Sequence, residues 1–321
     1  MRYSCALAPN HDIVDRARLA ERLGYHRVWV FESPAMYGDT WIALARVAEA
    51  TDRIGLATGV SIPGLRHPVV TASAAATVEE LAPGRLVLAF GTGATGRSTL
   101  GRKPLRLTEL ADHVRQVRAL LAGAVVEIDG RPVQRHLGAP VDVPVWLAVS
   151  GPKGLELATG APGVIATGVP PGGLHGWADV ALLRFGTVLD VGEDHTSPRV
   201  QAAAGPGYVS IAHLMWQQRE TAVDALPGGR GWRTALEAER PARERHLVAH
   251  QGHLQSLTER DRLLVDAAGP GLLAPGWSGD AAEIRRRIDE AAAAGVTEIV
   301  YVPAGPDRDR ELTAFATAAR P

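Results

Sequence analysis

A (β/α)8 barrel is the fold class that this sequence predicts, and three observations indicate it. Short apolar runs such as VWVF, LVLAF and VWLAV lack the polar–apolar alternation of a strand with one wet face, which is typical of parallel strands buried on both faces. Amphipathic segments separate these runs, and in the first half of the chain the spacing from strand to strand is about that of one βαβ unit. Eight such runs can be found, and this number fits a closed barrel better than an open sheet.

The predicted strands follow one another along the whole chain, and glycine and proline crowd the pattern of the sixth and seventh. In order they are Tyr3–Ala8, Arg27–Phe31, Ile54–Val60, Leu86–Gly91, Val145–Val149, Val164–Ala166, Tyr208–Ala212 and Glu298–Val302.

The segments between the strands predict helices with recognisable ends. The first has an apolar face from Ile13 to Leu23, and Gly24 follows it in the position of a C′ glycine. A late helix over Gly279–Ala294 begins with Asp280 and Glu283 at capping-box spacing. Further helices are predicted over Thr40–Ala50, Val69–Leu81, Leu107–Leu121, Pro152–Thr159 and Asp309–Ala319.

Two insertions interrupt the alternation of strands and helices. A hairpin is expected over Val125–Val133, around Asp129 and Gly130, inside an insertion near residues 123–141. A second insertion spans about residues 190–275, and its helical parts, within Thr234–Leu264, are expected to form a cap or a packing surface. Because no linker or low-complexity segment is found, residues 1–321 are predicted to form a single domain.

Composition excludes several classes of protein. Hydrophobic residues make up 46% of the chain, which allows a large core, and 34 Lys and Arg against 35 Asp and Glu leave no global field to attract nucleic acid or an anionic membrane. The single Cys5 excludes an intrachain disulfide and a zinc site built on several cysteines. No apolar run approaches the ~18 residues of a membrane span, and no signal-peptide region is found. We therefore expect a cytoplasmic protein without nucleic-acid or membrane partners.

In such a barrel, functional residues lie at the carboxyl ends of the strands. Glycine, serine and threonine at these ends allow a ligand to approach closely and supply hydroxyl and N–H donors. The candidates at these ends are Glu32, Ser33, Gly59, Val60, Ser61, Gly91, Thr92, Gly93, Ser150, Gly151, Pro152, Lys153, Gly154, Thr167 and Gly168.

Two glycine-containing segments have both a binding and a structural interpretation. The sequence SGPKG, from Ser150, lies beside a helix start where free N–H groups and Lys153 favour an anion, or it is a plain turn. GTGATG, from Gly91, matches the dinucleotide fingerprint formally, but Gly101 and Pro104 delay the helix that should follow at once. Its glycines therefore suggest a ligand lying flat on the strand end, or a tight loop.

Three kinds of polar residue remain open to more than one interpretation. Glu32 is either an exposed loop acid or a proton donor at the barrel mouth. His67 can titrate near neutrality or begin the helix after the third strand. His246, His250 and His253 have helical spacing, but no further ligands complete a clear site, so no metal is predicted. No G-x-S-x-G elbow supports a nucleophilic hydrolase.

Several segments resemble one known family. These are ESPAMYGDTWIALARVAEATDRIGLATGVSIPGLRHPVVTASAAATVEELAPGRLVLAFGTG, VSGPKGLELATGAPGVI, HLVAHQGHLQSLTERD and AAGVTEIVYVPAGPDRDRELTAFA. They are similar to the luciferase-like flavin-dependent oxidoreductases, and closest to the branch of the F420-dependent methylenetetrahydromethanopterin reductases. The match covers most of the chain and is weakest around residues 187–231.

The resemblance implies a flavin or deazaflavin lying across the strand ends. It places a non-proline cis peptide bond at Gly59-Val60, behind the ring. The phosphate would lie on Ser150–Gly154, and Thr167 with Gly168 would close the site. Glu32 matches a position where relatives often carry Asp followed by His; here Ser33 replaces that His, which leaves the acid–base role open.

The resemblance also implies the activity. The expected protein is an oxidoreductase that moves a hydride between coenzyme F420 and an unidentified small organic substrate, with Glu32 near the reacting centre. The substrate pocket would include Ser33, Trp41, His67 and, from the loop 170–177, Trp177. The alternatives are an FMN-dependent monooxygenase and a non-catalytic flavin-binding barrel. Family members are often dimers, so a homodimer is the assembly to test.

Overall fold

The computed structural model describes residues 1–136 and 138–320. Two compact units form within it. The first contains residues 1–96, 104–183 and 294–300, and the second contains residues 97–103, 184–293 and 301–321. The single domain expected from the sequence stays a prediction, and Leu137, inside the first predicted insertion, lies outside the described residues.

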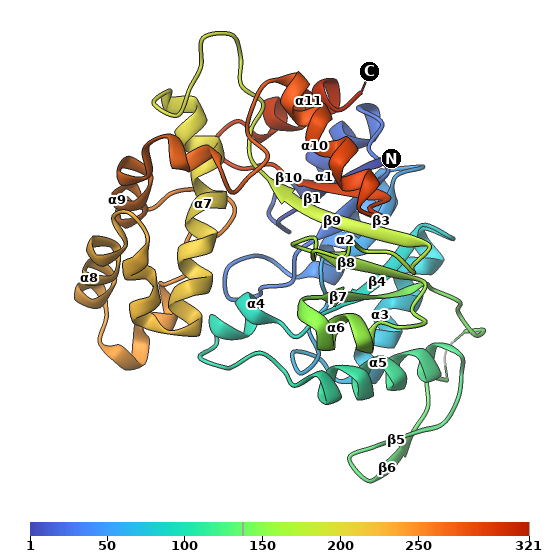
Figure 1. The fold of residues 1–321 in the computed structure, drawn as a ribbon. Coiled ribbons are helices and arrows are strands. Elements are labelled where there is room, and N and C mark those ends of the chain that lie inside the picture. The colour runs from blue at the N-terminus through green and yellow to red at the C-terminus, as the bar shows by residue number, and fades with distance from the viewer. Residues whose placement is uncertain (137, 321) are drawn as a thin grey trace. The chain divides into compact units, whose positions relative to one another are not determined.

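Eight strands of the described chain close into a barrel in the order β1-β10-β9-β8-β7-β4-β3-β2 (Figure 1). Neighbouring strands run parallel; in β2 and β3, for example, Arg27 lies opposite Gly55 and Val30 opposite Thr58. The fold is therefore the predicted (β/α)8 barrel. The barrel strands are β1 (Arg2–Leu7), β2 (Arg27–Val30), β3 (Gly55–Thr58), β4 (Leu86–Phe90), β7 (Val145–Val149), β8 (Gly163–Ala166), β9 (Asp179–Phe185) and β10 (Glu298–Val302).

The prediction of the seventh strand was wrong. Tyr208–Ala212 lies inside a helix, α7 (Pro198–Gln218), and the seventh strand of the barrel is β9. The run YVSIA is apolar because α7 is largely buried, and a short apolar run does not distinguish a buried helix from a buried strand. Gly205, Pro206 and Gly207, just before this run, are of residue types that usually interrupt a helix, yet all three lie inside α7.

The helices of the barrel unit largely follow the prediction. Gly24 has the positive φ, +74°, expected of a residue that ends a helix. One helix was not expected: α4 begins directly after Gly93, although it is only five residues long. The helices in this part of the chain are α1 (Ile13–Arg22), α2 (Thr40–Ala50), α3 (Pro68–Leu81), α4 (Ala94–Ser98), α5 (Leu107–Leu121) and α6 (Gly151–Leu157).

The predicted hairpin is present. Strands β5 (Val126–Ile128) and β6 (Arg131–Val133) pair antiparallel around Asp129 and Gly130, which have φ values of 52° and 70°. Such positive φ values at both central residues are those of the tight turn that Asp-Gly favours. The hairpin extends away from the barrel beyond α5 (Figure 1).

A charged pair lies among aromatic rings inside the barrel. Arg27 on β2 donates to Glu298 on β10 over 2.7 Å, and the indole N–H of Trp29 donates to the same carboxylate over 2.8 Å. Trp146 from β7 packs against Trp29, and the Arg27 guanidinium lies over both rings. These side chains fill the barrel, so a ligand at the rim has a closed floor beneath it.

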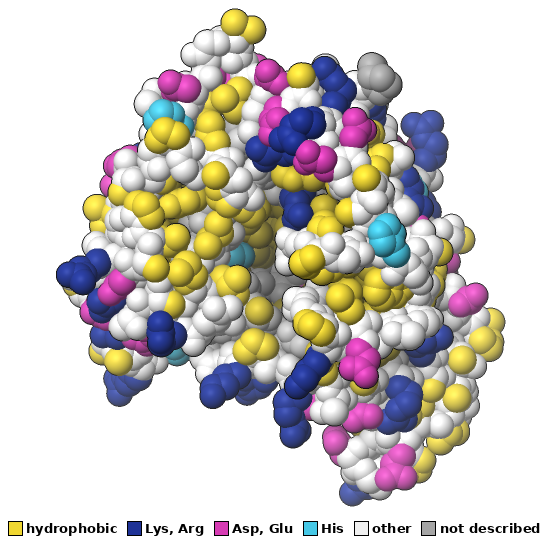
Figure 2. Space-filling model, in the orientation of Figure 1, with side chains coloured by type: hydrophobic (Ala, Val, Ile, Leu, Met, Phe, Trp, Pro, Cys, Tyr) yellow, Lys and Arg dark blue, Asp and Glu magenta, His cyan; other side chains and the backbone are white. Residues whose placement is uncertain are grey.

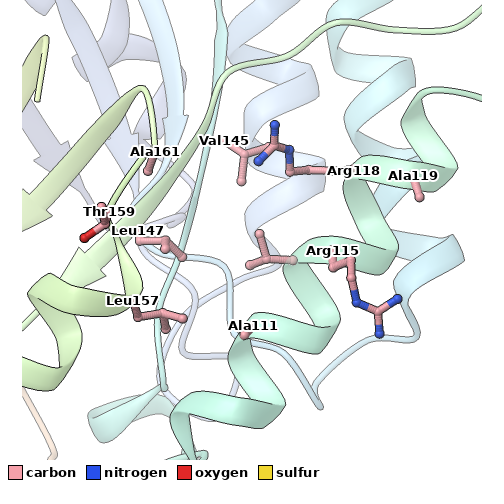
Figure 3. Close-up of a pocket in the computed structure, with 11 residues that line it drawn as sticks. Ala111, Arg115, Arg118, Ala119, Val145, Leu147, Leu157, Thr159 and Ala161 are labelled. Carbon is pink, nitrogen blue, oxygen red and sulfur yellow. The ribbon is translucent and has the colours of Figure 1, made fainter.

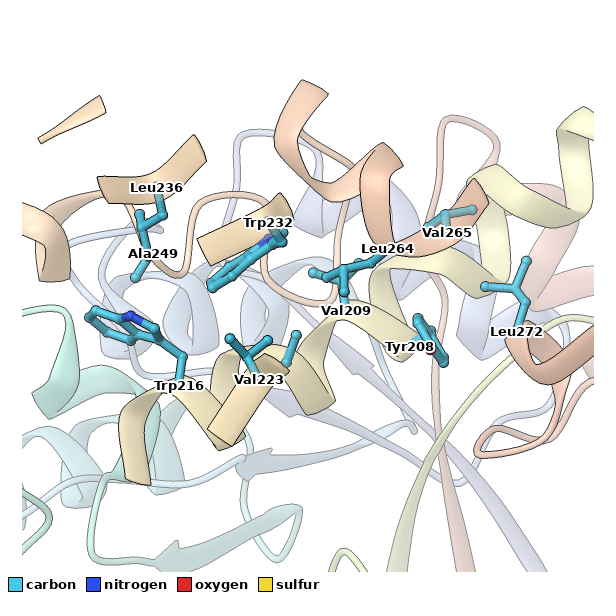
Figure 4. Close-up of a cluster of buried hydrophobic side chains, with 11 residues drawn as sticks. Tyr208, Val209, Trp216, Val223, Trp232, Leu236, Ala249, Leu264, Val265 and Leu272 are labelled. Carbon is cyan, nitrogen blue, oxygen red and sulfur yellow. The ribbon is translucent and has the colours of Figure 1, made fainter. Parts of the chain in front are cut away.

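The second unit is mainly helical. Several helical segments between residues 198 and 273 pack around an apolar cluster that Figure 4 shows, in which Trp216, Trp232 and Leu264 are buried. Helices are thus present in the predicted second insertion; its role as a cap stays a prediction. The helical elements are α7, η1 (Glu220–Ala225), α8 (Gly229–Glu239), η2 (Ala242–Leu247), α9 (Glu259–Ala268), η3 (Gly269–Leu273), α10 (Ala281–Ala293) and α11 (Arg308–Ala318).

Two surface properties follow the composition. On the face drawn in Figure 2, acidic and basic side chains are interspersed, as the nearly equal numbers of the two suggest. None of the helices formed by the described residues combines the length and the apolar character needed to cross a membrane.

Candidate functional site at the carboxyl ends of the barrel strands

The parallel barrel brings the carboxyl ends of β2, β3, β4, β7 and β8 to one rim, where most of the candidate residues lie. Backbone hydrogen bonds continue past three of these strand ends. Gly59 N–H donates to Val30 over 2.7 Å, Ser61 N–H donates to Ala89 over 2.7 Å, and Gly91 N–H donates to Ser61 over 3.1 Å. The loop after β3 is thus held against the end of β2 on one side and against β4 and the loop that follows it on the other.

Glu32 is a buried acid that holds the loop after β3. Its side chain is 5% exposed, and its Oε2 accepts hydrogen bonds from the backbone N–H of Ile62 and from the hydroxyl of Ser61, the latter over 3.2 Å. Of the two interpretations left open by the sequence, the exposed loop acid is excluded. Burial raises the pKa of Glu32, and the Ile62 N–H, the charge of Arg66 and the Ser61 hydroxyl oppose that rise.

Arg66 is a residue of this site that the sequence analysis did not select. Its Nε lies 3.6 Å from Glu32 Oε1, and its other end is paired with Asp39. Asp39 also caps α2, because it accepts from the N–H groups of Trp41 and Ile42. The sequence feature that could have drawn attention to Arg66 is its position as a cation two residues before Pro68, where a helix is predicted to begin. Arg66 therefore links the loop after β2 to the loop after β3.

The peptide bond between Gly59 and Val60 is cis, as the resemblance implied. The side chain of Val60 leans over the next strand end, because a Cβ on Gly91 would lie 2.7 Å from Val60 Cγ2. A side chain at Gly91 would therefore force Val60 to move.

Helix α4 closes the rim next to Glu32. A Cβ on Gly96 would lie 2.9 Å from the Glu32 carbonyl oxygen and 3.2 Å from Ser33 Oγ, so α4 and the loop after β2 are in close contact. Ser33 itself is buried, and its carbonyl accepts from the N–H groups of Met36 and Tyr37. Gly96 is the third glycine of GTGATG. Its lack of a side chain allows this close contact of α4, so the glycine is explained by packing and not by dinucleotide binding.

The turn after β7 is exposed and begins α6. Gly151 has φ +69°, which favours glycine, and Ser150 is the N-cap residue but makes no side-chain capping bond. Ser150, Pro152 and Lys153 are exposed, whereas Gly154 is buried. No atom lies within 4 Å of a Cβ built on Gly151 or on Gly168, so the backbone faces open space at both positions.

The predicted substrate-pocket residues are distributed differently. Trp41 is buried in the first turn of α2, and within residues 1–136 and 138–320 its indole N–H has no hydrogen-bond partner. His67 is exposed and is the N-cap residue of α3, because it accepts from Val69 N–H over 3.3 Å.

Trp177 does not join this group, because it lies two residues before the amino end of β9 and donates to Ala158 O at the end of α6. A parallel strand begins at the opposite rim of the barrel, so the sequence placed Trp177 at the wrong end.

Three histidines gather in the helical unit. His213 of α7 joins His250 and His253, with 2.9 Å between the Nδ1 atoms of His213 and His253. His246, grouped with them in the sequence, instead lies beside Gly101. In the part of the chain that the structure describes, no group of His, Cys, Asp or Glu residues fits a metal ion.

Comparison with known proteins adds the following. Residues 4–298 match the luciferase-like monooxygenase family. The 5,10-methylenetetrahydromethanopterin reductase of Methanolobus tindarius is 33% identical over 157 residues, which is 46% of each chain. The chain thus spans about half the length of this and other curated relatives that it matches.

Two other similarities extend over nearly whole chains. The F420-dependent glucose-6-phosphate dehydrogenase of Amycolatopsis mediterranei is 26% identical over 97% of this chain and 93% of its own. The solved structure of the coenzyme F420-dependent tetrahydromethanopterin reductase of Methanopyrus kandleri has a TM-score of 0.68 at 18% identity, over 99% of this chain and 97% of its own, and so shares the fold. Because the family match covers most of the sequence, this chain belongs to the luciferase-like monooxygenase family.

Proposed function

We propose that this protein is an oxidoreductase that transfers a hydride between coenzyme F420 and a small organic substrate. The observation that carries the proposal is the shared rim. The residues expected to hold the cofactor lie at the ends of β3, β4, β7 and β8, on the same rim as the buried acid that follows β2. The similarity over nearly the whole chain to an F420-dependent glucose-6-phosphate dehydrogenase supports the choice of cofactor.

The residues at the rim fit such a group. The backbone at Gly151 and Gly168 faces open space, so a ligand can approach the main chain at both positions. Exposed Ser150 and Lys153 offer a hydroxyl and a cation beside Gly151 N–H, a donor set suited to a phosphate. The unpartnered indole N–H of Trp41 is a buried donor, of a kind that natural proteins rarely leave unsatisfied.

Each residue has a task in this proposal. Ser150, Gly151, Pro152, Lys153 and Gly154 bind the phosphate, and Thr167 with Gly168 closes that end of the site. Gly59, Val60, Ser61, Gly91, Thr92 and Gly93 line the rim where the ring lies, and Ser33, Trp41 and His67 border the substrate.

When it is bound, F420 supplies the ring carbon that exchanges the hydride. Glu32 holds a proton near that centre. Its Oε2 is occupied by Ile62 N–H and Ser61 Oγ, which leaves Oε1, beside Arg66, as the oxygen able to exchange a proton.

A cofactor titration tests the proposal. Purified protein is titrated with F420 and, separately, with FMN, and binding is followed by the change in cofactor fluorescence. We expect saturable F420 binding that weakens about tenfold or more in Lys153→Ala, because a charge-assisted contact to phosphate is lost. Arg131→Ala, on the exposed hairpin, is the matched control. Failure to bind either cofactor would exclude the proposal.

An FMN-dependent monooxygenase is the second candidate, and the description of the matched family favours it. The rim and the phosphate turn would serve FMN in the same way. Tighter binding of FMN than of F420, together with oxygen consumption by the reduced FMN complex, would replace the first proposal by this one. Stable cofactor binding without turnover on any substrate would indicate the third possibility, a flavin-binding barrel.

A further inference from the structure

A cavity of about 570 Å³ lies on the outer face of the barrel, and the proposed function does not use it. Figure 3 shows it between α5 and α6, against β7. Trp146 faces the barrel interior, where it packs on Trp29, so its neighbours Val145 and Leu147 face outward. These two side chains form the floor of the cavity.

The cavity exists because the two helices beside β7 differ in length. Helix α5 has 15 residues and α6 has seven, which correspond to about 22 Å and about 10 Å. The shorter helix covers only part of the outer face of β7. Leu157 at the end of α6 and the turn 159–161 close the cavity on that side, and Ala111 and Val114 of α5 close the other.

The polar side chains at this cavity are mostly cationic. Its lining includes Arg115 and Arg118 but no acidic residue. Arg115 is paired with Asp112 over 3.1 Å. Arg118 has no ion-pair or side-chain hydrogen-bond partner among the residues the structure describes, and in Figure 3 its side chain extends toward Val145 while that of Arg115 points away. The remaining lining is Ala119, Thr159, Gly160 and Ala161 besides the residues named above.

We propose that this cavity binds a small organic anion with an apolar body, of the carboxylate class, and that Arg118 holds the carboxylate. The volume lies within the range of small-molecule sites, which combine apolar walls with a few polar groups that fix orientation. The apolar body packs on Val145, Leu147 and Leu157, and the carboxylate pairs with the unpartnered guanidinium of Arg118. An uncharged ligand of the same shape would lack this contact.

Binding of decanoate, below its micellar concentration, tests the proposal. The full chain is labelled at the methyl groups of Val and Leu and titrated while its NMR spectrum is recorded. We expect saturable shifts at Val114, Val145, Leu147 and Leu157. Decanol, which has the same body without charge, and inorganic phosphate, which has charge without the body, should each bind about tenfold more weakly or not at all.

Variants locate the site. Arg118→Gln removes the charge and Ala111→Phe fills the cavity from the surface of α5; each should weaken decanoate binding about tenfold or more, whereas Arg131→Gln should leave it unchanged. F420 binding by each variant is measured in parallel and should equal that of the wild type. This separates the cavity from the cofactor proposal, since either can fail alone.

Three outcomes overturn the inference. They are an absence of decanoate binding, binding that Arg118→Gln and Ala111→Phe leave unchanged, and equal binding of decanol. In the first two cases the cavity is not a site; in the third, the arginine does not select an anion.

Discussion

The charge of Arg66 acts on the pKa of Glu32 at the proposed site. Burial raises the pKa of Glu32, and the charge of Arg66 is one of the interactions that limit this rise. The Arg66→Gln variant should therefore raise the pKa of Glu32 further. The carboxyl carbon signal in a ¹³C NMR pH titration, assigned with Glu32→Gln, measures it. Arg66→Lys keeps the positive charge and should shift the pKa less; an unchanged or lower pKa in Arg66→Gln would contradict the pairing.

The pair inside the barrel gives a second prediction about single residues. Glu298 accepts from both Arg27 and Trp29, so Glu298→Ala leaves a buried guanidinium without its partner. We expect the free energy of unfolding to fall by about 3–5 kcal/mol, measured by urea denaturation. The double variant Arg27→Met/Glu298→Leu removes both charges and should lose less than the single variant. A loss below about 1 kcal/mol in Glu298→Ala, the range of a surface pair, would show that the pair is not buried in solution.

At the scale of elements, the accuracy of the sequence prediction depends on the length of each apolar segment and on how deeply the element is buried. The boundaries of α2, α5, β7 and β10 agree with the prediction, because their apolar patterns are long or bounded by clear turn residues. The run Tyr208–Ala212 was assigned to a strand because a short apolar run in a largely buried helix does not show the periodicity that distinguishes helix from strand. Strand β9 went unrecognised although its segment DVALLRF is mostly apolar.

The candidate site could be predicted in part for a related reason. The end of a strand can be found from the end of its apolar run, so the rim residues from Glu32 to Gly168 were predicted as the residues that follow these runs. Arg66 and Asp39 act through an ion pair between two loops, and nothing in the local sequence shows which loops meet. Trp177 was placed at the wrong rim, because the connection from β8 to β9 contains no helix whose ends would mark where the chain crosses the barrel.

At the scale of the whole molecule, the three histidines of the helical unit make stability depend on pH. Burial lowers the pKa of His250 to about 4 and, with the charge of His250, that of His253 to about 3. Burial also lowers the pKa of His213 well below its ordinary value, and the charged Arg260 nearby acts in the same direction. The imidazoles are thus neutral in the folded protein and titrate near pH 6.5 once it unfolds.

The direction in which stability changes with pH follows from these lowered histidine pKa values. Between pH 6.5 and about 4 the unfolded chain binds more protons than the folded protein does. The folded protein therefore has its full stability above this window and loses stability as the pH decreases through it. We expect the melting temperature to drop between pH 7.5 and pH 5, and His253→Gln should flatten the drop. His11→Gln, which changes an exposed histidine, is the control. An equal drop in both variants would assign the effect to groups other than these histidines.

The shortness of α6 has a thermodynamic consequence. One end of this seven-residue helix is the turn proposed to hold the cofactor phosphate, and its other end borders the cavity beside Leu157. If both ligands bind and each stiffens the helix, binding of the first ligand already reduces the conformational entropy of the helix. The second ligand then binds with a smaller entropic cost. Linkage then requires the anion to tighten the cofactor by the same factor by which the cofactor tightens the anion.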